Sequence, residues 1–243
     1  MRTPSATEVL QVWERGLAQT SAERALVLAA LACPEQPTEA LAQLPIGQRD
    51  RLLLQLRDRL LGSRLTSLAT CPQCGEAAEL SFDSAEILAT ACFDGTSPAH
   101  TTTTDGEVHF RLPNSADLLA ITGLERASAR RRLFERCILR VEQGGEPKPV
   151  EQLSEETLAA VAAQMAQIDS QAEVQLELAC PVCARHWLAP LDILAYLWSE
   201  INAWAGRTLR EIHLLASAYG WRESEVLALS PTRRQLYLQM IGN

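Results

Sequence analysis

Two short stretches, Cys71-Pro72-Gln73-Cys74 and Cys180-Pro181-Val182-Cys183, decide the fold that this sequence predicts. A Cys-x2-Cys pair forms a tight turn in which two thiolates can reach one metal ion at roughly 2.3 Å. Two such pairs supply the number of thiolates that a tetrahedral structural zinc requires. We therefore predict one structural Zn2+ ion, whose ligands are Cys71, Cys74, Cys180 and Cys183.

The residue after each pair also bears on this prediction. Gly75 suits the tight turn after the first pair, because glycine adopts positive φ angles without strain. Ala184 stands at the equivalent place after the second pair, where we expect slight strain.

Other metal sites are conceivable with these residues. His186, close after Cys183, could replace one cysteine, although His186-Trp187-Leu188 has the pattern of an outgoing strand. An iron–sulfur cluster or a rubredoxin-like iron could use the same thiolates, but no redox partner motif accompanies them. A catalytic zinc keeps an open position for water, and four cysteines leave none.

Alternating sequence flanks both pairs. Residues 78–83 alternate apolar and polar side chains after the first pair, and residues 173–178 do so before the second. Asp83 and Asp192 each lie nine residues after the last cysteine of a pair and precede an apolar helical segment. The pattern predicts two similar strand–knuckle–strand–helix units that meet at one metal, with internal duplication as a hypothesis.

Most of the remaining sequence has helical spacing. We expect helices over residues 7–18, 21–32, 38–44, 47–61, 84–92, 133–141, 154–168, 192–205 and 208–219, a last helix from Ser230, and a hairpin over 101–112. The predicted fold class is α+β and mainly helical, with helices surrounding a small zinc-ribbon-like β element formed by the two knuckles. Because 105 residues separate Cys74 from Cys180, we expect the intervening helices to be an insertion folded back on the ribbon.

This reading divides the chain into three parts. Residues 1–62 form an N-terminal helical region, and residues 63–205 form the zinc-ribbon core with its inserted hairpin and helices. Residues 206–243 form a C-terminal helical region.

The charge balance argues against a nucleic-acid surface. The formal net charge is -8 and the pI is about 5.1, whereas nucleic-acid-binding domains usually carry a basic excess. A local run of arginines is interpreted as a solvated helix face with some partner contacts, in preference to a phosphate-binding surface: Arg126, Arg130, Arg131, Arg132, Arg136 and Arg140.

Nothing in the sequence predicts export or membrane insertion. Residues 1–17 lack an apolar stretch and carry Glu8, Glu14 and Arg15, unlike a signal peptide. No apolar run approaches the roughly 20 residues of a membrane span. We therefore expect synthesis in the cytoplasm, where seven cysteines favour a metal over disulfides. Three cysteines remain outside the pairs, Cys33, Cys92 and Cys137, and Cys137 is expected to be a small core residue.

No catalytic motif accompanies the cysteines. The sequence lacks a phosphate loop, a dinucleotide fingerprint, a nucleophile elbow and a His-Glu-x-x-His motif. His100, His109 and His213 are scattered, and each is expected to be structural. We therefore expect no enzymatic activity and no small-molecule substrate.

Beyond the knuckles, the sequence holds further recognisable segments. The first group runs from residue 44 to residue 137: Leu44–Asp50, Leu52–Leu54, Gly62, Phe110–Pro113, Asp117-Leu118 and Glu135–Cys137. The second group follows Ala172: Cys180–Cys183, Asp192-Ile193, Leu197–Ile201, Ala218–Trp221 and Ser230-Pro231. Together they resemble the T4-type phage baseplate protein family, whose relatives are encoded in clusters for phage-tail-like contractile injection systems. The resemblance covers residue 41 onward.

The resemblance implies a non-enzymatic structural component at the baseplate of a contractile particle. Its partners would be other baseplate, spike or tube-initiator proteins, with no nucleic acid or membrane among them. The chain would be made in the cytoplasm and incorporated into the particle. A transient baseplate assembly factor, or a cytoplasmic zinc-ribbon adaptor unrelated to tails, remains an alternative.

Overall fold

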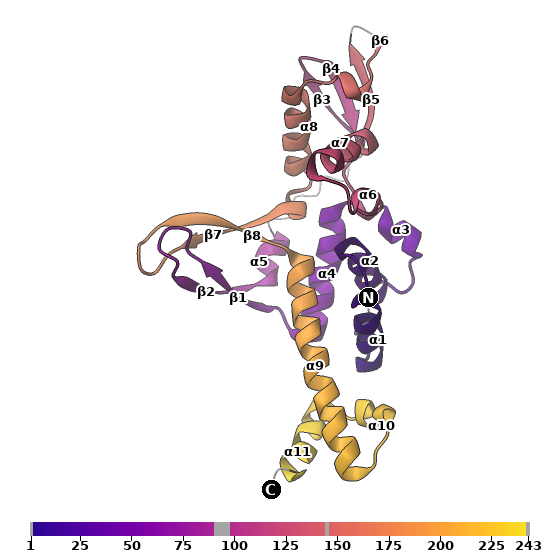
Figure 1. Ribbon diagram of the computed structural model, residues 1–243, viewed down its shortest axis with the longest axis vertical. Coiled ribbons are helices and arrows are strands. Elements are labelled where there is room, and N and C mark those ends of the chain that lie inside the picture. The colour runs from indigo at the N-terminus through magenta and orange to yellow at the C-terminus, as the bar shows by residue number, and fades with distance from the viewer. Residues whose placement is uncertain (1, 90–97, 144–145, 242–243) are drawn as a thin grey trace.

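The chain has an extended, branched shape in the computed structural model, which describes residues 2–89, 98–143 and 146–241 (Figure 1). A central helical body is formed by residues 2–61 together with the start of a long helix near the C-terminus. An arm of two β-hairpins, residues 64–83 and 174–191, projects from one side of the body. A mixed α/β head, residues 99–168, stands at one end, and a C-terminal unit, residues 206–241, stands at the other.

The body consists of short helices with well-defined ends. Its helices are α1 (Ala6–Gly16), α2 (Ser21–Ala32), α3 (Thr38–Ala42) and α4 (Ile46–Leu61). Capping boxes start α1 and α2, because Ser5 and Thr20 each exchange hydrogen bonds with a glutamate three residues later. Leucines from α2 and α4 meet the first turns of α9 (Ile193–Tyr219) in the largest core. The body therefore depends on a segment that lies some 140 residues away in sequence.

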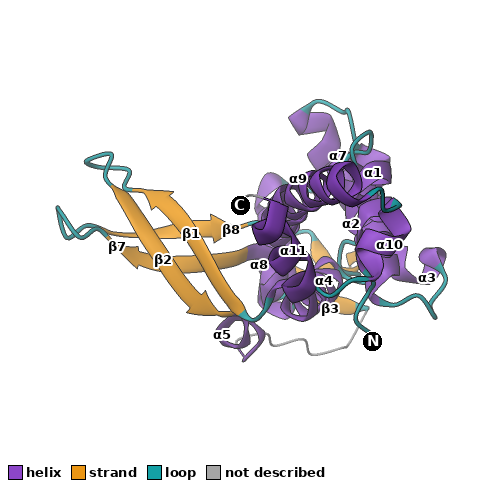
Figure 2. Cartoon of the chain, turned by 90° about the horizontal axis from the view of Figure 1, so that it is seen from below, coloured by secondary structure: helices purple, strands orange, loops and turns teal. Residues whose placement is uncertain are grey.

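The arm contains two antiparallel hairpins. The first joins β1 (Arg64–Thr70) to β2 (Ala77–Asp83), and the second joins β7 (Val174–Ala179) to β8 (His186–Leu191). Figure 2 shows the two hairpins crossing beside the helices, with their turns at the far end. The prediction that helices surround this β element is therefore wrong, because the helices lie to one side of it. Outward residues such as Leu68 and Leu188 are 72% and 62% exposed, because no helix covers the outer faces.

The head is built from the residues between the two hairpins. Its elements are β3 (Ala99–Thr103), β4 (Gly106–Phe110), α6 (Ser115–Ile121), α7 (Arg126–Cys137), β5 (Ile138–Gln143), β6 (Glu146–Pro147) and α8 (Glu155–Ile168). Its four strands pair in the order β3-β4-β5-β6, and a separate apolar core forms around Phe110 and Val161. The expectation that the insertion folds back on the ribbon is wrong, since the head points away from the arm (Figure 1).

Small connecting elements complete the chain. They are the helix α5 (Ser84–Ala89), which follows β2, and the 3-10 turns η1 (Val150–Gln152) and η2 (Ser170–Glu173). Asp83 accepts a hydrogen bond from the Ala85 N–H at the start of α5, and Asp192 accepts one from the Ala195 N–H at the start of α9. In both predicted hairpin–helix units, an aspartate at the end of the hairpin thus caps the helix that follows. Cys92 and Gly144-Gly145 lie outside the described residues.

Three predicted helices differ in extent from those in the structure. The helix expected over 133–141 ends at Cys137, and Ile138–Gln143 is strand β5, because Ile138 and Val141 pair with Phe110 and Val108 of β4. The helices expected over 192–205 and 208–219 are one 27-residue helix, α9, which crosses the predicted boundary at 205. Gly206 lies inside it, and a single glycine weakens a helix without ending it.

The C-terminal unit lies at the far end of α9. It adds α10 (Glu223–Ala228) and α11 (Pro231–Ile241), which pack on α9 through a small core around Leu215 and Val226. None of the helices in the described part of the chain combines the length and apolar character needed to cross a membrane.

Head and body meet at the start of α4. The Gly47 N–H donates to the Asp169 carboxylate at 2.9 Å, and a Cβ at Gly47 would lie 1.8 Å from that carboxylate. The neighbouring Ile46 N–H donates to the Pro113 carbonyl at 3.1 Å, and Arg49 reaches the Ser115 hydroxyl at 3.3 Å. This junction therefore requires a residue without a side chain at position 47.

Asp117 holds the head side of that junction together. Its fully buried carboxylate accepts two hydrogen bonds from Arg111, at 2.5 and 2.8 Å, and one from Arg136 at 2.7 Å. It also accepts from the Asn114 N–H at 3.0 Å, which caps α6. Burial opposes ionisation, yet the hydrogen bonds from Arg111 and Asn114 hold the pKa of Asp117 below its usual range.

We expect Asp117→Asn to lower the free energy of unfolding by about 3 kcal/mol, because it leaves two arginines without their anion. A carboxylate with a depressed pKa stabilises the fold above its unfolded pKa of about 4. The difference from the wild type should therefore be full at neutral pH and shrink as the pH falls below about 4. Urea unfolding followed by circular dichroism at several pH values measures it.

The control is Arg132→Gln, which removes an exposed ion pair with Glu135 on the same head. Its effect should stay within about 0.5 kcal/mol. Equal losses in both variants would contradict the role given to Asp117.

Candidate metal site

The four paired cysteines meet at the far end of the arm. Their sulfur atoms all lie within 4.8 Å of one another, with the Cys71–Cys183 pair at 3.7 Å and the Cys74–Cys180 pair at 3.5 Å. Each hairpin contributes one knuckle, and the crossing of the hairpins brings the two turns together (Figure 2). Among the described residues, no other group of histidine, cysteine and acidic side chains has metal-binding geometry.

The two knuckles share one backbone geometry. The N–H of the first cysteine donates to the carbonyl five residues later, at 2.8 Å for Cys71 and 2.9 Å for Cys180. The carbonyl of the first cysteine accepts from the residue after the pair, at 3.0 Å in both knuckles. Cys71 and Cys180 are both buried, so each knuckle presents one inner and one outer sulfur.

Ala184 adopts the conformation that glycine adopts in the other knuckle. Its φ is 55°, and Gly75 at the matching position has φ 77°. Among the described residues, Ala184 is the only non-glycine residue with positive φ. The left-handed region costs an L-residue roughly 1–2 kcal/mol, so the second knuckle carries the strain that the sequence predicts.

Backbone amides favour the thiolate form that a metal requires. The Cys74 N–H, which points at the sulfur of Cys71, lowers the pKa of that thiol to about 6. The Cys183 N–H lowers the pKa of Cys180 in the same way. Both of these thiols therefore ionise more easily than a free cysteine, which reduces the proton release that metal binding must drive.

The spacing of the sulfurs fits a tetrahedral zinc. A Zn–S bond of about 2.3 Å and a tetrahedral angle place neighbouring sulfurs roughly 3.8 Å apart. The Cys71–Cys183 and Cys74–Cys180 pairs, at 3.7 and 3.5 Å, agree with that value. Four thiolates around one point also suit a soft, borderline metal better than magnesium or calcium, which prefer oxygen. The donor set and its geometry can thus hold one metal ion.

The body fixes the root of the arm. Buried Arg57 on α4 donates to the carbonyls of Gly62 and Arg64, at 2.5 and 2.8 Å. The same guanidinium makes two hydrogen bonds of 2.8 Å with Glu200 on α9. The Tyr196 hydroxyl, also on α9, both accepts from the N–H of Thr66 and donates to its carbonyl. The preceding helix α4 and the distant helix α9 therefore together set the direction of β1.

The alternative ligand His186 is not part of the cluster. It lies on β8 with 70% of its side chain exposed, and its Nδ1 is 4.0 Å from Glu177. Cys33 and Cys137 are buried in the body and the head, away from the four sulfurs. Burial raises the pKa of Cys137 to about 12, which suits the core residue that the sequence predicts.

Comparison with known families identifies the class of protein. The family described as T4 bacteriophage base plate protein matches residues 20–192, which is well over half of the chain. The chain belongs to this family. The match includes both knuckles, the head and the head–body junction, and it ends at the residue before α9. No curated protein and no solved structure gives a match.

The family match starts and ends earlier than the resemblance predicts. It begins at residue 20 rather than near residue 41, and it excludes the C-terminal segments Leu197–Ile201, Ala218–Trp221 and Ser230-Pro231. The family relationship thus rests on the body, arm and head.

We expect Cys74→Ser to abolish stoichiometric metal binding and lower the melting temperature by more than about 10 °C. Three thiolates hold a metal poorly, and metal binding is coupled to folding in sites of this kind. Cys183→Ser should behave in the same way. Elemental analysis and thermal unfolding of the purified chains give both readouts.

His186→Ala is the matched control, because it removes the one histidine beside the knuckles. It should keep the metal and the melting temperature of the wild type. If both cysteine variants kept their metal content, the four-sulfur site would be refuted.

We expect Ala184→Gly to raise the free energy of unfolding by about 0.5–1 kcal/mol, because it removes the strain at positive φ. Gly75→Ala, at the matching position of the first knuckle, should lower it by a similar amount. Urea unfolding of the metal-loaded variants measures both changes, and shifts of the same sign would contradict the equivalence of the knuckles.

Proposed function

We propose that this chain is a structural, non-catalytic subunit at the baseplate of a contractile, phage-tail-like injection system. In this role it joins neighbouring proteins of the particle, and a zinc ion bound by the four cysteines stabilises its arm. The family relationship supports the baseplate part of the proposal. The shape and exposed surface of the chain support the joining role.

The observation that carries the proposal is the amount of exposed surface. The chain exposes 13607 Å2. A compact monomer of 26.7 kDa exposes roughly 10,700 Å2, so this chain exposes about 2,900 Å2 more. One partner in a standard interface buries about 800 Å2. The excess is therefore enough for several interfaces, as expected of a part that is completed by its neighbours.

The arm illustrates how this surface arises. It is only two hairpins thick, and its strands of seven residues extend roughly 23 Å. An isolated two-stranded hairpin is marginally stable in water. A zinc ion at the far end would hold both hairpins in one geometry and leave their outer faces free for contacts. The metal would thus supply rigidity rather than chemistry.

The same site argues for the absence of catalysis. Four thiolates fill a tetrahedral zinc completely, so no position remains for a water or a substrate. We therefore infer that the partners are proteins of the particle: other baseplate, spike or tube-initiator proteins. Synthesis in the cytoplasm followed by incorporation into the particle is part of the proposal.

Quantitative mass spectrometry and zinc analysis of purified contractile particles from the native host test this proposal. A structural subunit should be present in a fixed ratio to the spike and sheath proteins, with one zinc per chain. Recovery only with incomplete baseplates would instead identify a transient assembly factor. Absence from both fractions would refute a role at the baseplate and favour a cytoplasmic adaptor.

A further inference from the structure

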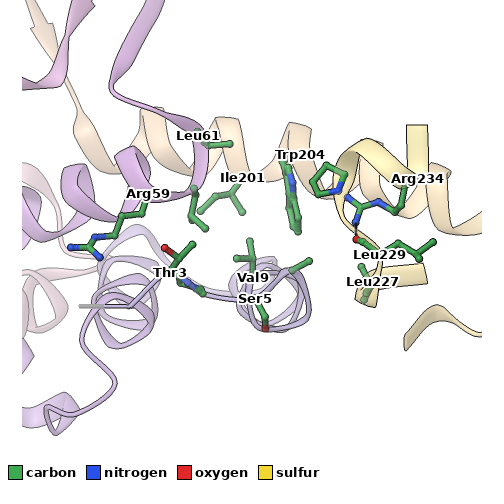
Figure 3. A pocket seen from close by; sticks show the side chains of 14 residues that line it. Thr3, Ser5, Val9, Arg59, Leu61, Ile201, Trp204, Leu227, Leu229 and Arg234 are labelled. Atoms are coloured by element: carbon green, nitrogen blue, oxygen red, sulfur yellow. Dashed lines mark hydrogen bonds between the residues drawn. The ribbon is translucent and has the colours of Figure 1, made fainter. Parts of the chain in front are cut away.

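A groove lies where the C-terminal unit meets the body (Figure 3). It has a volume of about 440 Å3, within the range of specific binding pockets. The start of α1, the end of α4, the middle of α9 and the α10–α11 connection form its walls, and most of the lining is apolar. Figure 3 shows Val9, Ile201, Trp204 and Leu227 around the groove. It is thus open to an apolar side chain from outside.

The charged residues of the lining have one sign. Arg59 and Arg234 line the groove, and no acidic residue does. Arg234 is only 5% exposed; its Nε donates to Glu211 and its Nη1 to the Leu229 carbonyl, both at 2.9 Å. Among the described residues, no hydrogen bond partner is found for its Nη2. The groove therefore offers a cationic donor beside an apolar floor.

The net charge of the C-terminal unit is also positive. The sequence after residue 205 holds five arginines and three glutamates, whereas the whole chain holds 22 basic and 30 acidic residues. The unit is thus locally basic in an acidic protein. It also carries several exposed large apolar residues, among them Leu236 and Met240. A partner that matches this end of the molecule would combine acidic and apolar groups.

We propose that the groove is the docking site for a segment of another baseplate protein in which a bulky apolar side chain stands next to an aspartate or glutamate. The apolar side chain enters between Val9 and Trp204, and the carboxylate pairs with the guanidinium of Arg234. This inference rests on the proposed function, because it takes the partner from the same particle. Only three of the fourteen lining residues, Arg59, Leu60 and Leu61, lie within the family match, so this contact is a property of the present chain.

Site-specific photocrosslinking in the native host tests the proposal. Benzoylphenylalanine replaces Thr3, which is exposed and lines the groove, or Thr7, which is exposed on α1 and does not line it. Particles and baseplate intermediates are purified after irradiation, and the crosslinked peptides are sequenced by mass spectrometry. We expect position 3 alone to crosslink to one baseplate protein, at a segment with adjacent apolar and acidic residues.

A matched pair of variants measures the effect of filling the groove. Thr3→Trp places an indole at the groove, and Thr7→Trp places the same side chain on the neighbouring surface. Loss of a central contact in an interface weakens binding by at least about tenfold. Thr3→Trp should therefore lower the amount of chain recovered with the baseplate by about that factor, and Thr7→Trp should not. Thermal unfolding of both variants should match the wild type.

Each outcome separates the docking site from the proposed function. If the chain is recovered with baseplates but position 3 gives no crosslink, or crosslinks to a second copy of this chain, the docking proposal is refuted and the function stands. If position 3 crosslinks to an acidic–apolar segment of a protein outside the particle, the proposed partner and the baseplate role are both refuted. Equal crosslinking from positions 3 and 7 would also refute the groove as the site.

Discussion

The whole arrangement depends on four sulfurs meeting at one point although 105 residues separate the two pairs. Each pair must lie at the turn of a hairpin, and the two hairpins must have similar lengths and face each other. The direction of the arm is then set at its root, where Arg57 and Tyr196 tie β1 to α4 and α9. Because the second hairpin leads directly into α9, the geometry at the sulfurs also positions the helix that completes the body core. The position of the four sulfurs is thus linked, through the second hairpin, to the packing of the body core.

The head joins this frame through a different kind of constraint, which is close backbone contact. Because Gly47 has no side chain, the Asp169 carboxylate can reach the start of α4. On the head side of this junction, the Asp117 carboxylate accepts hydrogen bonds from both Arg111 and Arg136. Apart from Asp169, these residues belong to the segments outside the knuckles that carry the family resemblance in the sequence. Their separate positions along the chain converge in space. The junction therefore accounts physically for a sequence pattern that otherwise looks scattered.

Sequence reasoning identified what local rules determine. The cysteine spacing, the alternating strands and the caps of the helices each act over a few residues, so the hairpins and most helices could be predicted. The arrangement of these parts could not, because it depends on contacts such as Gly47 to Asp169 that no local pattern marks. Two separate helices were expected over residues 192–205 and 208–219, whereas packing on both sides of Gly206 keeps α9 continuous. The strain at Ala184 was predictable because the first knuckle provided a reference with glycine.

The order of the segments along the chain has a consequence for biosynthesis. A ribosome adds roughly 5–20 residues per second, so several seconds pass between the synthesis of the first knuckle and that of the second. During that interval the complete head emerges and can fold through its own core. Until the second knuckle is synthesised, the first knuckle offers only two thiolates, which hold a metal weakly. Closing a loop of about 100 residues is entropically costly, and an ion that binds last would offset that cost in one step. Zinc binding would then be a late step of folding, and it would fix the arm in its rigid form.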